Sequence, residues 1–332
     1  MSHSFTVPER YSEHALQAFF AANPHACYGL DTQTWQTTQP RPSTPVVTIV
    51  TEHPNMHIVE GVMVALAAQT QVYSVSLHPL STVLPQTGLC LSVAHLPDAE
   101  LVAQIAQQFH VEVFAQQQQP VLSLPGVLVM DMDSTVIQIE CIDEIAKLCG
   151  KGEEVSAVTE LAMQGKLDFA ESLLQRVACL EGIDVTTLAQ IRDSIPLMPG
   201  IQTLLRHLKA QGWICAIASG GFTYFAEYLQ ARLGLDVVVA NELEQRNGLL
   251  TGNIVGAISD AQTKADTLLR LVKTHDIAPE QTIALGDGAN DLVMMAHAQL
   301  GMAYHAKPLV QAKATAAIRF GGLDNTLFAL QG

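Results

Sequence analysis

From residue 126 onward, short and almost uninterrupted apolar segments alternate with longer stretches of helical periodicity. Strands that are apolar on both faces occur mainly in parallel sheets that helices cover on both sides. We therefore predict an α/β domain over residues 121–332 with a parallel sheet at its centre. The apolar segments are VLVMD at 127–131, WICAIAS at 213–219, DVVVA at 236–240, TIALGD at 282–287 and LGMAYH at 300–305.

Two stretches of this domain depart from a simple alternation of strand and helix. After Asp133 the chain runs to Leu208 with helical periods and no convincing strand, which is far longer than a single crossover requires. We predict a helical insertion at about 141–208 that forms a cap over the carboxyl ends of the strands. At 242–256, ELEQRNGLLTGNIVG has a turn signal between two strand-like stretches, which predicts a hairpin.

A different order of elements precedes the α/β domain. Residues 1–44 are polar and end in a Pro/Ser/Thr cluster, so we treat them as an N-terminal extension. Residues 45–120 show the order β-α-β-β-α-β, an α+β ferredoxin-like arrangement that resembles ACT-type regulatory domains. That resemblance implies either amino-acid binding or pairing into a homodimer. We favour packing or dimerisation, because the first strand-to-helix turn, TEHPNM at 51–56, lacks the glycine common in ACT-type ligand sites.

Composition narrows the class of protein. The chain of 332 residues carries 17 Lys and Arg against 32 Asp and Glu, a formal net charge of -15, which argues against a nucleic-acid partner. Its six cysteines include no CxxC pair, which favours free thiols in a reducing compartment. There is no signal-peptide pattern and no apolar run near the ~18 residues that a membrane span needs. We expect a cytoplasmic protein with no membrane partner.

Residues that could take part in catalysis or ligand binding lie at the strand ends. Asp131 and Asp133 end the first apolar segment, and residues two apart face the same side of an extended chain. Two carboxylates this close repel unless a positive group lies beside them, and Mg²⁺ is a hard cation that prefers oxygen ligands. Ligands of open parallel sheets bind beyond the carboxyl ends of the strands, which is where these two acids lie.

Other strand ends add groups suited to phosphate. Ser219 and Gly220 offer a hydroxyl and backbone N–H groups at a helix start, and Lys264 begins a later helix. Asp287 and Asp291 lie in a predicted turn that contains glycine. Each of these has an ordinary explanation as a turn former or a solvated charge. Their joint occurrence at the ends of successive strands predicts a site for a phosphate and a metal ion.

Four of these motifs carry a family resemblance. DMDST at 131–135, SGG at 219–221, Lys264 and GDGAND at 286–291 are similar to the signature motifs of the haloacid dehalogenase (HAD) superfamily of phosphotransferases. Residues 126–325 resemble the phosphoserine phosphatase family within it, through DSTVIQIECIDEIAKLCG after the first aspartate and MQGKLDFAESLLQRVACLEG in the predicted cap. The resemblance implies a HAD-like Rossmannoid sheet and hydrolysis of O-phospho-L-serine to L-serine, the last step of serine biosynthesis.

The resemblance also implies roles for the acids. Asp131 would attack phosphorus and become a transient aspartyl phosphate, and Asp133 would protonate the leaving oxygen and then deprotonate the attacking water. Mg²⁺ would be held by the carboxylates of Asp131 and Asp287 and the main-chain carbonyl of Asp133, with Asp291 in support. Whether the pKa of Asp133 is raised by its neighbour's charge or lowered by the metal and Lys264 stays open at this stage.

Substrate recognition is implied in the same way. Glu140 would meet the ammonium group and Arg176 the carboxylate, while Met163 and Phe169 would form an apolar lining in the cap. Taken singly, Glu140 is also explained as a helix-start acid, Arg176 as an exposed charge, and Met163 and Phe169 as core residues. The remaining substrate contacts implied are Ser219, the Gly220 N–H and Lys264 on the phosphoryl oxygens, and Asn290.

Two other hypotheses remain. In the first, the chain is a HAD phosphatase or phosphotransferase for another small phosphorylated metabolite. The pair Glu140 and Arg176 discriminates between this hypothesis and a phosphoserine phosphatase, because recognition of an α-amino acid needs both. Alternatively it would be a binding protein controlled by phosphorylation of Asp131. That hypothesis requires no acid/base partner two residues later, so Asp133 argues against it.

Overall fold

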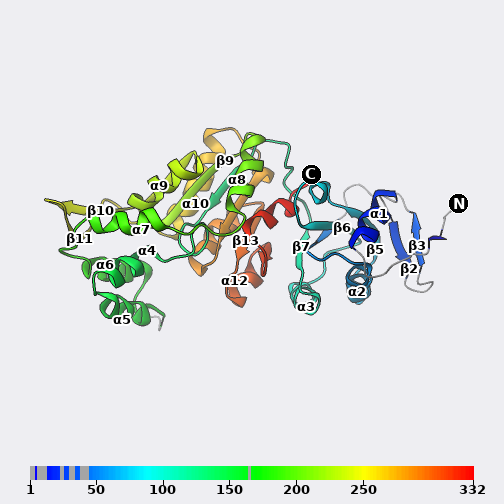
Figure 1. Cartoon of the computed structure of the whole chain (residues 1–332), viewed down its shortest axis with the longest axis horizontal. Helices are drawn as coiled ribbons and strands as arrows, with labels where there is room; N and C mark the ends of the chain where they lie inside the picture. The colour runs from blue at the N-terminus through cyan, green and yellow to red at the C-terminus, as the bar shows by residue number, and fades with distance from the viewer. Residues whose placement is uncertain (1–3, 6–12, 23–25, 30–33, 38–44, 164–165) are drawn as a thin grey trace. The chain divides into compact units, whose positions relative to one another are not determined.

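The computed structural model describes residues 4–5, 13–22, 26–29, 34–37, 45–163 and 166–332 (Figure 1). The chain divides into two compact units, one made of residues 1–123 and 305–332 and the other of residues 124–304. Within the described residues, no helix combines the length and the apolar character needed to cross a membrane.

The second unit contains the predicted parallel sheet. Its strand order is β11-β10-β9-β8-β12-β13, with β8 (Val127–Met130) between β9 (Ile214–Phe222) and β12 (Thr282–Gly286). These neighbours run parallel to β8, as β13 (Leu300–Tyr304) does to β12 and β10 (Val237–Arg246) does to β9. Every residue of β8, β12 and β13 is buried, which explains why these segments are apolar throughout.

Helices surround this sheet and form the stretch predicted as an insertion. Between β8 and β9, the described residues form helices and a few isolated β-bridges, but no strand. Helix α6 begins with a capping box, in which Asp168 accepts from the Glu171 N–H and Glu171 accepts from the Asp168 N–H. The helices are α4 (Cys141–Leu148), α5 (Gly152–Met163), α6 (Phe169–Ala178), α7 (Thr186–Ser194), α8 (Ile201–Ala210), α9 (Thr223–Leu233), α10 (Ala261–Thr274) and α11 (Leu292–His297), with 3₁₀ turns η2 (Pro279–Gln281) and η3 (Ala289–Asp291).

The predicted hairpin is present and has a second role. Strand β11 (Leu249–Val255) runs antiparallel to β10 after a turn in which Asn247 and Gly248 both have positive φ. The start of this strand also pairs with residues 182–185 of the insertion. Leu250 donates to the Ile183 carbonyl (2.8 Å) and its carbonyl accepts from the Gly182 N–H (2.9 Å), while the Val185 N–H donates to the Gly248 carbonyl (2.9 Å). The hairpin therefore holds the helical insertion at the connection between α6 and α7.

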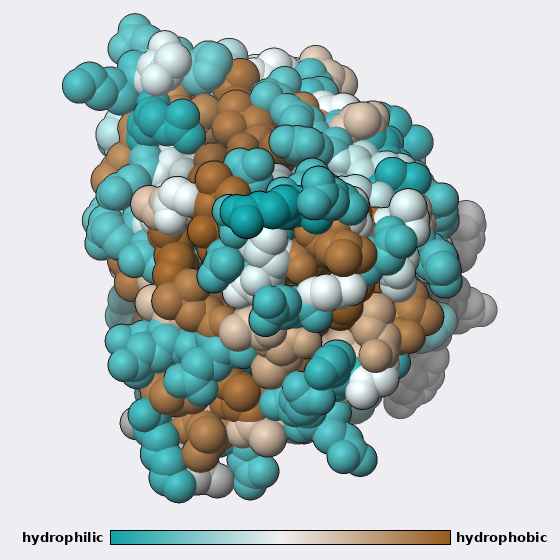
Figure 2. Space-filling view, turned by 90° about the vertical axis from the view of Figure 1, so that its left-hand side faces the viewer, coloured by the Kyte–Doolittle hydropathy of each residue, from teal (hydrophilic) through white to brown (hydrophobic). Residues whose placement is uncertain are grey.

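The outer surface of the hairpin and α6 is mixed in polarity. Leu174, Leu249 and Val255 are exposed there among polar neighbours. Figure 2, which looks at the side of Figure 1 that carries α6 and β11, shows brown apolar atoms scattered among teal hydrophilic ones. Scattered apolar residues of this kind are ordinary on a folded protein and imply no partner by themselves.

The first unit has the predicted β-α-β-β-α-β order. Its four core strands pair antiparallel in the order β5-β6-β4-β7, which is the ferredoxin-like arrangement. Its elements are β4 (Val46–Thr51), α2 (Met56–Leu66), β5 (Val72–Leu77), η1 (Pro79–Thr82), β6 (Thr87–Val93), α3 (Ala99–Phe109) and β7 (Glu112–Gln116).

The N-terminal extension continues the same sheet. Strand β2 (Ala26–Gly29) pairs antiparallel with β5 and with β3 (Thr34–Thr37), and β1 (Ser4–Phe5) pairs with β3. Helix α1 (Glu13–Ala22) buries Leu16 and Phe20, which lie four residues apart and so on one helix face. These segments make the extension part of the fold. The predicted loop at 38–44 lies outside the described residues.

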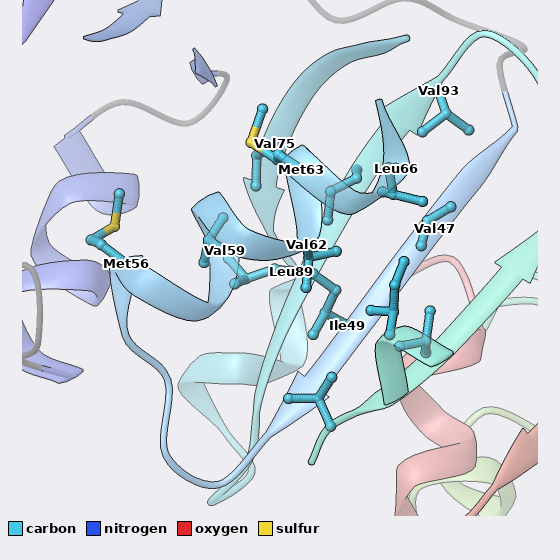
Figure 3. Packing of buried hydrophobic residues seen from close by; sticks show 14 of the residues in the cluster. Val47, Ile49, Met56, Val59, Val62, Met63, Leu66, Val75, Leu89 and Val93 are labelled. Carbon is cyan, nitrogen blue, oxygen red and sulfur yellow. The ribbon is translucent and has the colours of Figure 1, made fainter. Parts of the chain in front are cut away.

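Apolar side chains of α2 and the sheet form the core of this unit. Val59, Val62, Met63 and Leu66 repeat at helical spacing and are buried on one face of α2. Figure 3 shows them packed against side chains from β4, β5 and β6, including Val47, Ile49, Val75 and Leu89. Helical periodicity in the sequence thus corresponds to a buried face.

The C-terminal residues belong to the first unit by their contacts, although the sequence boundary placed residues 305–332 with the α/β domain. The Glu112 carboxylate accepts the backbone N–H groups of Arg319, Phe320 and Gly321 at 2.7–3.0 Å. The His78 ring bonds the Leu330 carbonyl at 2.8 Å. These contacts join residues more than 200 positions apart, so local patterns do not reveal them. The segment comprises α12 (Pro308–Lys313), β14 (Ala316–Ile318) and η4 (Leu323–Ala329).

Glu112→Gln should lower the free energy of unfolding by about 2–4 kcal/mol, because hydrogen bonds to a charged acceptor are strong and glutamine offers one acceptor oxygen in place of two. Glu112 is 3% exposed, so water does not replace what is lost. Urea unfolding followed by circular dichroism measures the change. The matched control is Glu100→Gln on the exposed face of α3, where little change is expected. Equal free energies of unfolding for the two variants would contradict the role of Glu112 in holding the C-terminal segment.

Candidate active site

A cavity of about 160 Å³ opens at the carboxyl ends of β8, β9 and β12 in the second unit. Parallel sheets bind ligands at this edge. Residues from the sheet and from the helical insertion both line it. Of the residues predicted from sequence, the lining includes Asp131, Asp133, Glu140, Phe169, Arg176, Ser219, Gly220, Asp287 and Asn290.

Asp131 is held at the end of β8. Its N–H donates to the Leu285 carbonyl of β12 at 2.9 Å, which continues the sheet pairing to this residue. Its Oδ1 accepts the Met132 N–H at 2.7 Å, and its Oδ2 lies 2.9 Å from Lys264 Nζ. The side chain is 7% exposed and faces the cavity, so the carboxylate is fixed beside a positive charge.

Lys264 lies beneath the cavity in the first turn of α10 and is 1% exposed, which excludes an ordinary solvated lysine. Its Nζ contacts two carboxylates, Asp131 Oδ2 at 2.9 Å and Asp291 Oδ1 at 2.7 Å. Burial opposes the charge, but the two carboxylates outweigh that effect and raise the pKa of Lys264. The lysine is therefore a permanent cation behind the nucleophile position.

Asp133 is a buried acid whose pKa is raised. Burial, followed by the charges of Glu140 and Asp131, raises its pKa well above the usual value, against a weaker opposing hydrogen bond from the Cys141 thiol. Its Oδ1 is buried without a hydrogen-bond partner among the described residues. Without a metal ion, burial and the neighbouring carboxylates thus raise the pKa of Asp133.

Three carboxylates converge in a way that fits a cation. One oxygen from each of Asp131, Asp287 and Asp291 lies within 4.8 Å of the others. Burial and then the charge of Asp131 raise the pKa of Asp287 to about 6, despite a hydrogen bond from the Thr135 hydroxyl at 3.1 Å. Carboxylates brought together in this way at low exposure are the oxygen donors that Mg²⁺ prefers. Both oxygens of Asp291 are already used, one by Lys264 and the other by the Gly288 N–H at 3.0 Å.

The Ser219-Gly220-Gly221 segment differs in one respect from the prediction. We expected it at a helix start, but β9 continues to Phe222 and α9 begins at Thr223. The side chain of Asn241 on β10 holds the segment by donating to the Gly220 carbonyl at 2.8 Å and accepting the Ser259 N–H at 2.8 Å. The Ser219–Gly221 segment that lines the cavity is therefore part of a strand end, kept in place by a buried side chain.

The insertion supplies the opposite wall of the cavity. Phe169 and Arg176 lie on α6, and the Phe169 ring packs so close to Gly220 that a Cβ there would lie 2.7 Å from it. Glu140 precedes α4 and accepts the Ser134 hydroxyl at 2.7 Å; burial raises its pKa. An acid and a guanidinium thus line one cavity, as recognition of an α-amino acid requires.

Three predicted residues do not line the cavity directly. Lys264 and Asp291 lie behind it, where Lys264 contacts Asp131 and Asp291, and Asp291 accepts the Gly288 N–H. Met163 ends α5, and its side chain lies outside what the structure describes.

Sequence reasoning missed three supporting residues. Ser134 orients Glu140 and has φ of 56°, a left-handed conformation that is uncommon outside glycine. Thr135 orients Asp287, and Asn241 orients Gly220. Ser134 and Thr135 stand inside the DMDST motif, where they were available as candidates. Asn241 had no such signal because its partners come from other parts of the chain.

Comparisons with known proteins agree with this geometry. A sequence model of haloacid dehalogenase-like hydrolases matches residues 128–296. A phosphoserine phosphatase of Vibrio cholerae is 52% identical over 238 residues, which cover 71% of this chain and 73% of that protein. The unliganded crystal structure of a probable phosphoserine phosphatase from the same species has a TM-score of 0.73 at 42% identity, covering 87% of this chain and 86% of that one.

A further solved structure, a phospho-aspartyl intermediate analogue of phosphoserine phosphatase, has a TM-score of 0.59 at 35% identity and covers 62% of this chain and 99% of its own. The parallel sheet, the cavity at its carboxyl edge and these similarities agree. The chain belongs to the haloacid dehalogenase-like hydrolases and, within them, to the phosphoserine phosphatase family.

Proposed function

We propose that this chain hydrolyses O-phospho-L-serine to L-serine and phosphate through an aspartyl phosphate on Asp131, and so completes serine biosynthesis. The observation that carries the proposal is the composition of one cavity. The cavity contains the Asp131 carboxylate, which is paired with a buried lysine. It also contains Glu140 and Arg176, an acid and a base suited to the two charged groups of an α-amino acid. The relatives described above are phosphoserine phosphatases, and one was solved as an analogue of the phospho-aspartyl intermediate.

In the first step the Asp131 carboxylate attacks phosphorus and the serine oxygen leaves. Lys264, the Ser219 hydroxyl and the Gly220 N–H stabilise the charge on the phosphoryl oxygens. The raised pKa of Asp133 keeps a proton available for the leaving oxygen. In the second step the same residue, now ionised, takes a proton from the water that hydrolyses the aspartyl phosphate.

Mg²⁺ is the metal we propose for this site, held by the carboxylates of Asp131 and Asp287 and by the main-chain carbonyl of Asp133. When bound, it would neutralise phosphate charge and orient the phosphoryl group for in-line attack. Asp291 supports this arrangement by fixing Lys264 and the Gly288 turn.

Substrate choice is assigned to the wall that the insertion supplies. Glu140 would pair with the substrate ammonium and Arg176 with its carboxylate, a bidentate contact available to arginine. Asn290 would add a polar contact, and Phe169, with Met163, would exclude water. A small cavity of this kind disfavours bulky phosphoproteins.

The test is a phosphate-release assay on L-phosphoserine, D-phosphoserine, phosphothreonine, 3-phosphoglycerate and an aryl phosphate, with magnesium and with a chelator. Arg176→Ala should lower kcat/KM for L-phosphoserine about 10²–10³-fold, because a buried charge-assisted contact is lost. Cleavage of the aryl phosphate, which has no carboxylate, should change little. The matched control is Arg206→Ala on the exposed face of α8.

Three outcomes of this assay would redirect the proposal. If phosphoserine is no better than the other substrates, the chemistry at Asp131 stands and another small phosphorylated metabolite is the substrate. If Arg176→Ala lowers all activities equally, the arginine does not select the carboxylate. Full activity in the chelator would remove magnesium from the proposal.

We also propose that the first unit pairs two chains into a homodimer and that the protein works in the cytoplasm. The free thiols of Cys90, Cys141, Cys149, Cys179 and Cys215 fit a reducing compartment. Analytical ultracentrifugation tests the assembly. Deleting residues 1–120 is a poor test, since residues 305–332 pack with them in one unit.

A further inference from the structure

A second cavity, of about 220 Å³, lies entirely within the first unit. The turn after β4, the start of β7 and the C-terminal segment form its walls. Its lining includes Glu52, His53, Gln86, His110, Phe320 and Asn325. None of these residues takes part in the proposed phosphatase reaction, so whatever binds here has a different role.

Two side-chain oxygens at this cavity have no hydrogen-bond partner among the described residues. They are Gln86 Oε1 and Asn325 Oδ1, on side chains that are 7% and 3% exposed. The Gln86 amide cannot simply be reversed, because its Nε2 donates to the Asp324 carboxylate at 3.2 Å and an oxygen there would face a negative group. Buried carbonyl oxygens normally have a donor, so two of them beside a cavity indicate that a donor is to be supplied.

The other groups of the lining specify the charge of that donor. Glu52 adds an exposed carboxylate, and His110 and Phe320 add aromatic rings whose centroids are 4.2 Å apart. The lining contains no lysine or arginine among the described residues. Glu112 lines the cavity too, but its oxygens already accept three backbone N–H groups. Carbonyl oxygens, a carboxylate and aromatic rings together favour a cation that carries N–H groups.

We propose that this cavity binds a small primary amine in its ammonium form. The ammonium donates to Gln86 Oε1 and Asn325 Oδ1, and Glu52 attracts it at the mouth. Both oxygens are closed from solvent in this structure, so binding requires the Gln86 and Asn325 side chains to turn toward the ligand. A free amino acid fits less well, because no fixed cation among the lining residues is available for its carboxylate.

The test uses three probes of similar size in isothermal titration calorimetry: ethanolamine, ethylene glycol and tetramethylammonium. Only ethanolamine combines a positive charge with N–H donors. Because Glu140 in the catalytic cavity is also suited to an ammonium, the titrations use the full chain carrying Glu140→Gln. Ethanolamine should bind with a Kd at least tenfold lower than either other probe.

Variants then place the binding site. Asn325→Leu should raise the Kd for ethanolamine at least tenfold. Glu52→Gln should raise it about threefold, and because this residue is exposed its replacement keeps the fold even if Asn325→Leu does not. Glu100→Gln on the exposed face of α3 should leave the Kd unchanged. Tetramethylammonium binding as tightly as ethanolamine, no ethanolamine binding at all, or binding indifferent to both variants would each overturn the proposal.

Discussion

Asp131→Asn is expected to lower kcat for L-phosphoserine by at least about 10⁴-fold, because an amide does not replace a carboxylate as the attacking nucleophile. The loss should be as large for an aryl phosphate, whose leaving group is better, since both reactions begin at the same oxygen. Steady-state phosphate release measures it. In single-turnover experiments with ³²P-labelled substrate, the wild-type chain should carry acid-stable label and the variant none.

The control for this variant separates chemistry from folding. Asp266→Asn, on the exposed side of the helix that carries Lys264, should retain full activity. Thermal unfolding of Asp131→Asn should remain a single transition, although the amide now faces Lys264 at the place of a 2.9 Å ion pair. Label that persists in a folded Asp131→Asn protein would move the nucleophile to another residue.

Asp133→Asn is expected to separate the two chemical steps. With phosphoserine, activity should fall about 10²–10⁴-fold, the usual range for a general acid and base. With an aryl phosphate the first step needs little protonation, so a burst of aryl alcohol equal to the enzyme concentration should precede a slow steady state. Stopped-flow absorbance detects that burst.

The pattern of the burst is what tests the dual role of Asp133. The proposed role requires that labelled enzyme accumulates in the variant, because water attack has lost its base. A uniform loss for both substrates without a burst would show that Asp133 only supports the geometry of Asp131. The raised pKa of Asp133 arises mainly from burial, so an asparagine is tolerated there at small cost to the fold.

Sequence patterns predicted most of the catalytic unit because each signal is local. Apolar segments such as 127–130 became strands buried at every residue, and the turn at Asn247 and Gly248 became a hairpin. The C-terminal segment was different. Its place in the first unit depends on Glu112 and His78, whose partners lie more than 200 residues away and carry no periodic pattern.

The site was predictable to a similar degree and for the same reason. Asp131 and Asp287 directly follow strands, Ser219 lies near the end of another, and parallel strand ends meet at one edge. The buried ion pairs of Lys264 and the support of Gly220 by Asn241 depend on three-dimensional packing. The direction of the Asp133 pKa shift required burial, which spacing alone does not give.

The pairing of residues 182–185 with the hairpin constrains how the helical insertion can move. Backbone hydrogen bonds hold the insertion between α6 and α7, so we expect any opening to be a rotation about a pivot at this point and not a translation of all its helices. Helix α6 leads directly into the pivot from its C-terminal end. Arg176, near that end, therefore moves less than Phe169 at the other. We therefore expect Arg176, the residue proposed to select the substrate, to stay nearly in place, while the Phe169 ring beside Gly220 moves away from the cavity.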